Sequence, residues 1–444
     1  MQPAEPAHAE LATLVERALA EATQAGASAA DVGVSVDSGL SVTVRLGEVE
    51  TLEYQRDRGM GITAYVGQRK GTATTGDLSW AAIADTVRKA VSIARFTAED
   101  DCAGLPDQAT LAREVPDLDL SHPWPLEAEA AIELARRCEA AALGHDPRIT
   151  NSEGASVGAH RGFRVYGNSL GFVGGYPSTY ATISCVVVGA EGEQQERDYW
   201  YSAVRDWQAL EDAAAIGRHA ALRTAARLGA RRIPTTRAPV LFVPELARGR
   251  SGHFVAAVRG AAQYRKSTFL LDAAGERVFP EHVHIAERPH LLRGLGSAPF
   301  DGEGCTTRDR ELVVKGVLDG YVLDSYAARK LGLATTGNAG GVHNLLVSPG
   351  ADDYAALLRR MGRGLVVTEL MGHGVNGVTG DYSRGAAGFW VEGGELAFPV
   401  NEITIAGNLK DLFQELVAVG SDVDRRGSIQ TGSILVAEMT IAGE

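Results

Sequence analysis

The chain has 444 residues, of which 45 % are hydrophobic and 22 % charged, which suffices for two or three globular domains. Its formal net charge of −13 argues against a nucleic-acid-binding protein, because such proteins neutralise phosphates with basic residues. Its four cysteines include no Cys-x-x-Cys pair, so we expect no disulfide framework and a cytoplasmic location.

The chain also lacks the sequence signals of export and membrane insertion. The first ten residues carry no basic stretch followed by an apolar run, so we expect no signal peptide. No window approaches the roughly 20 apolar residues that cross a bilayer, so we expect no membrane association.

The N-terminal part has the pattern of a helix, antiparallel strands and a second helix. Apolar residues at helical spacing predict a first helix over about 11–22, which Gly26 ends. A second amphipathic helix is expected over about 79–96. Alternating apolar residues between the helices predict strands over 32–36, 40–46 and 62–66. Together these elements predict a compact α+β unit.

The rest of the chain divides at two proline-rich segments, over 104–125 and 229–239, which we interpret as connections. Between them we expect helices over about 126–143 and 210–228 and a strand-rich region over 149–201. Short strands dominate beyond them, with helices near 352–361 and 409–419. The predicted fold is multi-domain α+β: an N-terminal helix plus antiparallel strand unit (1–115), a central α+β region (116–232) and a C-terminal region rich in antiparallel strands (233–444).

The stretch over 365–409 is the most informative part of the sequence. It places nine glycines among alternating apolar residues, and such density indicates tight turns, bulges or close approach of another backbone. Val391 and Leu396 flank the pair Gly393-Gly394, which predicts a hairpin.

Several motifs in and around this stretch resemble the TldD/PmbA family, and specifically its PmbA (TldE) branch. The motifs are MGHGVNG at 371–377, TGDYSRGAAGFW at 379–390, PVNEITIAGN at 399–408, PFDGEG at 299–304 and the segments 316–326, 332–338 and 430–443. The TldD branch resembles a zinc metallopeptidase in which an H-E-x-x-x-H helix holds the metal and its glutamate polarises a water. The resemblance implies that a PmbA-type chain is the partner subunit in a heterodimer that degrades or matures peptides and unfolded small proteins.

This sequence departs from the zinc motif where the helix should carry it. The segment 245–258 follows an apolar strand and contains a single histidine, His253, with Phe254 after it and Val258 five positions on. H-E-x-x-H and H-E-x-x-x-H occur nowhere in the chain. We therefore expect no catalytic residue, metal ligand or bound cofactor in this chain, and we expect zinc in a TldD-type partner.

Four polar residues of the glycine-rich stretch are the candidate peptide-binding residues: Glu369, His373, Asp381 and Ser383. We expect them to line a groove in which exposed strand edges pair with an extended peptide. The alternative is that they form turns and caps, because Asp and Ser side chains readily bond nearby backbone amides.

Two other groups of residues could carry chemistry. His282 and His284 would point the same way from a strand and could bind a metal, although solvated histidines are the commoner case. Asp301 and Glu303 could act as a carboxylate pair near Cys305, or could form an acidic turn.

Two further functions stay open beside the subunit hypothesis. One is a non-enzymatic peptide-binding or chaperone-like adaptor, most simply a homodimer. The other is a free-standing hydrolase whose metal ligands come from His253, His282, His284 and His373.

Overall fold

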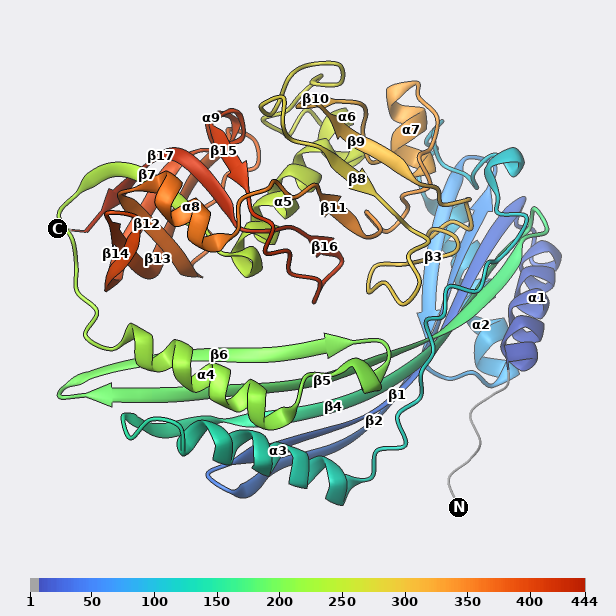
Figure 1. Ribbon diagram of the computed structural model, residues 1–444. Helices are drawn as coiled ribbons and strands as arrows, with labels where there is room; N and C mark the ends of the chain where they lie inside the picture. Colours follow the sequence, from blue (N-terminus) through green and yellow to red (C-terminus); the bar gives the residue numbers. More distant parts are fainter. Residues whose placement is uncertain (1–7, 444) are drawn as a thin grey trace.

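The computed structural model describes residues 8–443, and its two main parts are a long curved sheet and a strand-rich C-terminal domain (Figure 1). The C-terminal domain lies over the concave side of the sheet, and helices cover the opposite side. Residues 1–7, on which the expectation of no signal peptide partly rests, lie outside the described part, as does residue 444.

The N-terminal elements follow the predicted order, with one difference in the strands. They are α1 (His8–Gln24), β1 (Ala29–Arg45), β2 (Glu48–Val66), β3 (Arg69–Thr75) and α2 (Trp80–Phe96). The prediction of two strands over 32–36 and 40–46 is wrong, because β1 runs through both. Its centre, Asp37–Gly39, has the composition of a turn but stays extended because β1 pairs with β2 on one side and β4 on the other.

The central elements add three strands to the same sheet. They are α3 (Ala128–Leu143), β4 (Ile149–Asn168), β5 (Val173–Glu191), β6 (Gln194–Val204) and α4 (Ala213–Arg227), with short 3₁₀ turns at η1 (Gln108–Thr110) and η2 (Trp207–Ala209). The strand order is β3-β2-β1-β4-β5-β6, and all pairs are antiparallel. The predicted boundary at 115/116 therefore falls between strands that share one sheet, and the domain limits stay predictions.

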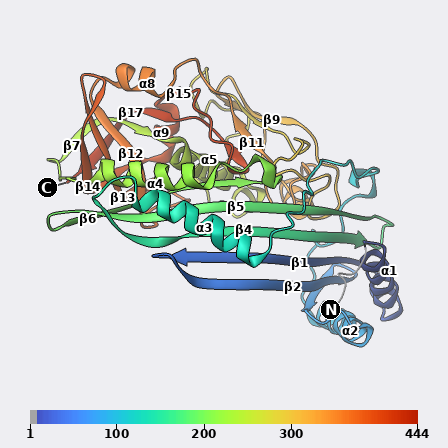
Figure 2. The ribbon, with the colours of Figure 1, turned by 60° about the horizontal axis from the view of Figure 1, so that its bottom comes forward.

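The two helix pairs cover opposite ends of one face of this sheet. Val32 and Val34 of β1 are buried with residues of α1 and α2, whereas Leu40, Val42 and Val44 are buried with residues of α3 and α4. Because side chains alternate along a strand, these even-numbered residues lie on one face. Figure 2 shows the two helix pairs set apart along the strands. The odd-numbered residues of β1 face the C-terminal domain.

The C-terminal region forms two smaller sheets. Its elements are β7 (Thr236–Phe242), α5 (Pro244–Val258), α6 (Gly260–Tyr264), β8 (Ile285–Glu287), β9 (Arg310–Val314), β10 (Val317–Leu318), α7 (Ser325–Leu331), β11 (Leu345–Val347), α8 (Tyr354–Met361), β12 (Gly364–Met371), β13 (Asp381–Glu392), β14 (Glu395–Asn408), α9 (Leu409–Gln414), β15 (Leu416–Val419), β16 (Ile429–Gln430) and β17 (Ile434–Ala442). One sheet has the order β10-β9-β8-β11-β16. The other has the order β14-β13-β12-β7-β17-β15, and β14 also pairs with β17, so these strands close on themselves.

Two sequence predictions for this region have different outcomes. The hairpin at Gly393-Gly394 is confirmed: Val391 pairs with Leu396, and both glycines have positive φ, 61° and 82°. The helix predicted over 409–419 is partly wrong, because α9 ends at Gln414 and the apolar run that follows pairs with β17 as β15.

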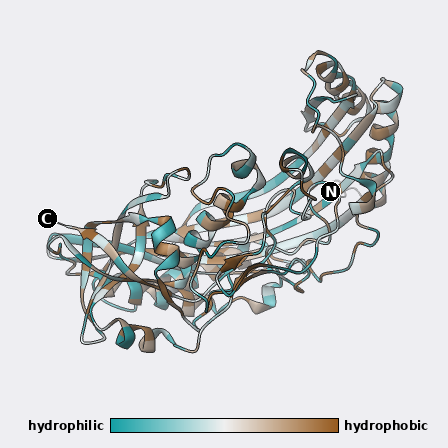
Figure 3. Cartoon of the chain, turned by 90° about the horizontal axis from the view of Figure 1, so that it is seen from above, coloured by the Kyte–Doolittle hydropathy of each residue, from teal (hydrophilic) through white to brown (hydrophobic). Residues whose placement is uncertain are grey.

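Apolar residues gather in the strands and helices, and the loops between them are mostly polar (Figure 3). Among residues 8–443, every helix is too short or too polar to cross a membrane.

Candidate peptide-binding site

The four candidate residues lie in one stretch of the C-terminal domain, from the end of β12 through the loop 372–380 to the start of β13. His373, Asp381 and Ser383 are exposed, whereas Glu369 is partly buried. The structure thus keeps three of the four available to a ligand and engages the fourth in an internal contact.

Asp381 takes part in the hydrogen bonds that shape this loop. Its carboxylate accepts hydrogen bonds from the Thr379 hydroxyl at 2.6 Å and the Asn408 amide at 3.2 Å. Its backbone carbonyl accepts from the Asn376 amide at 2.8 Å. These contacts correspond to the turn-forming role weighed above, and a peptide-binding role for Asp381 stays a prediction.

Strand addition by a peptide is blocked at β13. This strand pairs with β14 along its length and with β12 from Gly385 onward. Before Gly385, the loop 372–380 occupies the position beside β13 that β12 occupies further on. The Ser383 amide donates a hydrogen bond to the Gly374 carbonyl of this loop at 2.7 Å. A peptide at this position would therefore contact side chains and the exposed loop rather than an edge of β13, and the peptide groove stays a prediction.

Glu369 belongs to a buried ion-pair network that joins the C-terminal domain to the long sheet. Arg227 of α4 contacts Glu369, and it also lies 3.2 Å from Glu196 and 3.7 Å from Asp198 of β6. Burial acts against the charge of Arg227, but the three carboxylates outweigh it and raise the pKa of the guanidinium. Sequence spacing gave no sign of this network, because its members come from three separate elements.

A second contact joins the two parts at the other end of the sheet. Asp100, which follows α2, accepts hydrogen bonds from the Tyr326 hydroxyl at 2.6 Å and the Lys330 ammonium at 2.8 Å, both on α7. Next to this contact lies a cavity of about 830 Å³, which Tyr65, Lys70 and Glu303 help to line. The C-terminal domain is thus fixed to both ends of the sheet.

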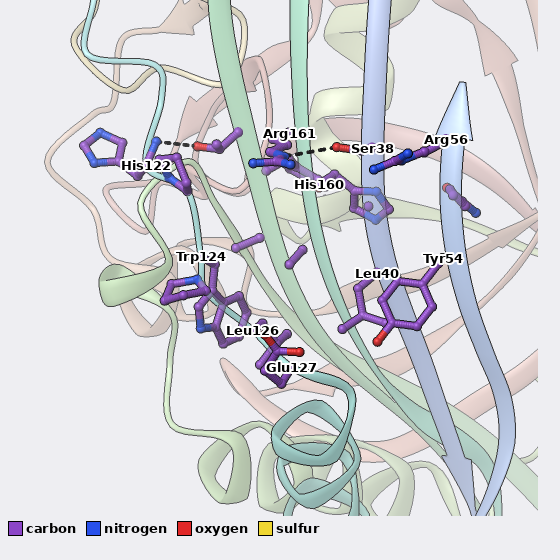
Figure 4. Close-up of a pocket in the computed structure, with 18 residues that line it drawn as sticks. Ser38, Leu40, Tyr54, Arg56, His122, Trp124, Leu126, Glu127, His160 and Arg161 are labelled. Atoms are coloured by element: carbon purple, nitrogen blue, oxygen red, sulfur yellow. Dashed lines mark hydrogen bonds between the residues drawn. The ribbon is translucent and has the colours of Figure 1, made fainter. Parts of the chain in front are cut away.

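A groove lies on the helix-covered face where the two helix pairs leave the sheet open. Its volume is about 550 Å³. Figure 4 shows His122, Trp124, Leu126 and Glu127 on one side of it, Ser38, Leu40, Tyr54 and Arg56 on the other, and His160 and Arg161 between them. Basic and aromatic side chains line it together. The sequence signal of this groove is the run Pro123-Trp124-Pro125, which ends the segment interpreted above as a connection. The Leu120 carbonyl before this run accepts a hydrogen bond from the Thr179 amide of β5 at 2.9 Å.

The two histidines that the sequence placed on a strand lie outside it. His282 lies in a turn and His284 just before β8, so the expected strand over these two residues is wrong. The turn forms because the Val283 amide donates to the Pro280 carbonyl at 3.0 Å. Burial and the positive charge of Arg360 lower the pKa of His282.

Asp301, Glu303 and Cys305 do lie together, with their ligand-type atoms within 4.8 Å of one another. The Asp301 carboxylate is buried and accepts hydrogen bonds from the backbone amides of Glu303, Cys305 and Ala339, each at 2.9 Å. Burial nevertheless raises the pKa values of Asp301 and Glu303. This geometry is that of the acidic turn considered above.

Helix α5 brings a different group of side chains together. Pro244 occupies its first turn, where a missing amide hydrogen costs nothing. Phe254 is fully buried, and Arg250 on the same face is only 3 % exposed. The His253 ring meets the Tyr382 ring of β13 edge to face, with centroids 6.2 Å apart. Helical spacing of Ala247, Arg250 and Phe254 could have placed this arginine on the buried face.

Comparison with known proteins identifies the family. Family models of the PmbA/TldA metallopeptidases match residues 30–94 (domain 1), 121–228 (central domain) and 235–443 (C-terminal domain). The chain belongs to the PmbA/TldD metallopeptidase family. It is 51 % identical over 415 residues to metalloprotease PmbA of Escherichia coli O157:H7, which covers 94 % of this chain and 92 % of that protein. It is 48 % identical over 435 residues to a PmbA homolog of Haemophilus influenzae, which covers 98 % of this chain and 96 % of that protein. These relatives place it in the PmbA (TldE) branch.

Solved structures share the whole fold. A candidate modulator of DNA gyrase from Bacteroides thetaiotaomicron has a TM-score of 0.92 at 28 % identity and covers 97 % of this chain and 98 % of its own. TldE from Thermococcus kodakarensis has a TM-score of 0.84 at 21 % identity, and the match covers 97 % of this chain and 100 % of that protein. The multi-domain α+β fold is thus confirmed.

The family name implies a metal, but the side chains of α5 do not fit a zinc site. Zinc needs three or four neutral imidazole or anionic ligands, and α5 supplies only His253 and Glu245, whose carboxylate pairs with Arg223 and Arg426. Burial and the positive charges of Arg250 and Arg384 lower the pKa of His253. Two guanidinium groups beside one imidazole repel a divalent cation, so no reaction step of this chain is assigned to a metal.

Proposed function

We propose that this chain is the PmbA/TldE-type subunit of a heterodimeric metallopeptidase that degrades or matures peptides and unfolded small proteins. The zinc and the water-activating glutamate belong to a TldD-type partner. The observation that carries the proposal is the composition of α5, whose buried face presents a cation where a metal site needs ligands. The relationship to proteins named metalloprotease PmbA supports it.

The role of this subunit is to shape the chamber that holds the peptide. Its concave sheet face offers hydroxyl groups, because partly exposed Ser and Thr side chains alternate with buried apolar ones, as at Thr182 and Ser184 of β5. Thr43 and Ser156 hydrogen-bond across strands on this face at 2.9 Å. Such groups can both donate to and accept from an extended backbone. The exposed residues His373, Asp381 and Ser383 extend this polar surface in the proposal.

Mixing the purified chain with a TldD-type protein from the same genome tests the proposal. A one-to-one complex by size-exclusion chromatography, with peptide cleavage only in the mixture, is the expected result. Failure to associate at micromolar concentration, or equal cleavage by the TldD-type protein alone, counts against it.

The second candidate is a homodimeric peptide-binding or chaperone-like adaptor. The same hydroxyl-rich concave face favours it, because binding there needs no catalytic group. Peptide binding by a self-associated chain that ignores the TldD-type protein would select this function. The histidine-based hydrolase has less support. Among residues 8–443, the group of side chains close enough to hold a metal ion is Asp301, Glu303 and Cys305. None of the four histidines proposed as ligands belongs to this group.

A further inference from the structure

Three side chains at the contact of α5 and β13 carry buried hydrogen-bond donors without an acceptor. Both terminal nitrogens of Arg250, the hydroxyl of Tyr382 and the Nε atom of Arg384 make no hydrogen bond of normal geometry. The Arg384 side chain nevertheless acts on the Tyr382 hydroxyl and opposes the rise that burial causes in its pKa. Arg250 is 3 % exposed and Tyr382 is 2 % exposed. Buried polar groups in folded proteins are almost always paired, so three in one place indicate a missing acceptor.

Arg250 has little compensation inside the chain. Its guanidinium carbon lies 4.6 Å from the centre of the Phe242 ring, a cation–π contact that offsets only part of the lost hydration. Burial lowers its pKa to about 10, so it remains charged at neutral pH. The charge is therefore buried and incompletely paired, which is costly unless a ligand supplies the partner.

The nearby carboxylates are already engaged elsewhere. Glu369 on the neighbouring strand β12 contacts Arg227, and Asp381 on β13 accepts from Thr379 and Asn408. On α5 itself, Glu245 pairs with Arg223 and Arg426. The groups that do act on the site are basic: Arg250 and Arg384 both lower the pKa of His253, whose ring contacts Tyr382.

We propose that Arg250, Tyr382, Arg384 and His253 form a binding site for a carboxylate group of a peptide. The two terminal nitrogens of a guanidinium match the two oxygens of a carboxylate, and the Tyr382 hydroxyl and Arg384 Nε supply further donors. His253 and Arg384 are partly exposed, so they lie on the side from which the group enters. A phosphate would also satisfy these donors, but peptides are the ligands of the proposed function, and the choice of ligand rests on that function.

Two kinds of peptide carboxylate have this chemistry: the C-terminal group and an acidic side chain. Calorimetric titration of the full chain with three probes distinguishes them. The probes are tetra-alanine as the free acid, tetra-alanine as the C-terminal amide, and the amide carrying one glutamate. We expect the free acid to bind roughly ten- to a hundredfold more tightly than the plain amide, as charge-assisted hydrogen bonds imply. If the glutamate-containing amide and the free acid bind equally tightly, the site accepts both a C-terminal carboxylate and an acidic side chain.

Variants locate the effect. Arg250→Met should abolish the preference for the free acid and raise the melting temperature, because it removes an unpaired buried charge. Tyr382→Phe removes one donor and should reduce the preference without abolishing it. The matched control is Arg237→Met. Arg237 is an exposed arginine of β7 that pairs with Glu438, and its replacement should leave the preference for the free acid unchanged.

The outcomes separate this site from the function on which its ligand rests. Equal binding of all probes, no binding of any, or a preference that survives Arg250→Met overturns the carboxylate site, even if the chain assembles with a TldD-type protein and the pair cleaves peptides. A preference that depends on Arg250 in a chain that does not assemble upholds the site and removes the subunit function.

Discussion

Replacing Asp31 by asparagine should stabilise the protein, and the gain should depend on pH. Asp31 lies on β1, and its side chain is on the face of the sheet toward the C-terminal domain. Burial raises its pKa from 3.8 to about 6. Lys70 and Thr63 oppose this rise, and the carboxylate of Glu303 adds to it. An ionised Asp31 is therefore a cost to the folded state.

The magnitude follows from the difference between the folded and unfolded pKa. Below pH 3.8 the carboxyl group is protonated in both states and costs nothing, whereas above pH 6 it is ionised in both. Each unit of pKa difference corresponds to about 1.4 kcal/mol, so ionisation reduces the free energy of unfolding by about 3 kcal/mol at pH 8. At pH 4.5 the same relation gives about 1 kcal/mol.

Urea unfolding of the wild type and Asp31→Asn at pH 4.5 and pH 8 measures this difference. The variant should gain more at pH 8 than at pH 4.5, by about 2 kcal/mol. Asp101→Asn, a change at an exposed carboxylate, is the control and should show no such pH dependence. The same gain at both pH values, or a loss at pH 8, would refute the assignment of a partly buried and destabilising carboxylate.

Three further experiments test separate parts of the structure. Arg227→Met removes the cation from three carboxylates and should lower the free energy of unfolding by about 3–5 kcal/mol in urea titrations. Gly388→Ala would place a methyl group 1.8 Å from a backbone oxygen of β12 and should lower the free energy of unfolding by about 3 kcal/mol or more. The control Gly33→Ala on β1 adds a methyl group in open space and should change the free energy of unfolding little. Alanine at both Asp381 and Ser383 should slow peptide cleavage by the reconstituted pair; unchanged turnover with intact assembly would make both residues structural.

Local patterns predicted the helices of the first half of the chain well. The apolar positions of α1 and α2 repeat at helical spacing, and both helices bury those positions against the sheet. The strands were harder, because Asp37–Gly39 has turn composition and only pairing on both sides keeps it extended. The single long sheet depends on pairing of β1 with β4, more than 100 residues away, which no local pattern reveals.

The sequence could group only those candidate residues that are neighbours along the chain. The glycine-rich stretch gave His373, Asp381 and Ser383, which the structure keeps exposed. It did not show that Glu369 is held by Arg227, because that contact spans 142 positions. Arg250 shares helical spacing with the buried residues Ala247 and Phe254, but arginine is normally exposed, so the residue type outweighs the spacing as a signal.

Metal analysis combined with a peptidase assay tests the central claim most directly. The account predicts that the purified chain alone holds no stoichiometric zinc and cleaves no peptide, and that its complex with a TldD-type protein holds zinc and cleaves. Zinc bound in stoichiometric amount by this chain alone, together with peptide cleavage that a chelator abolishes, would contradict it.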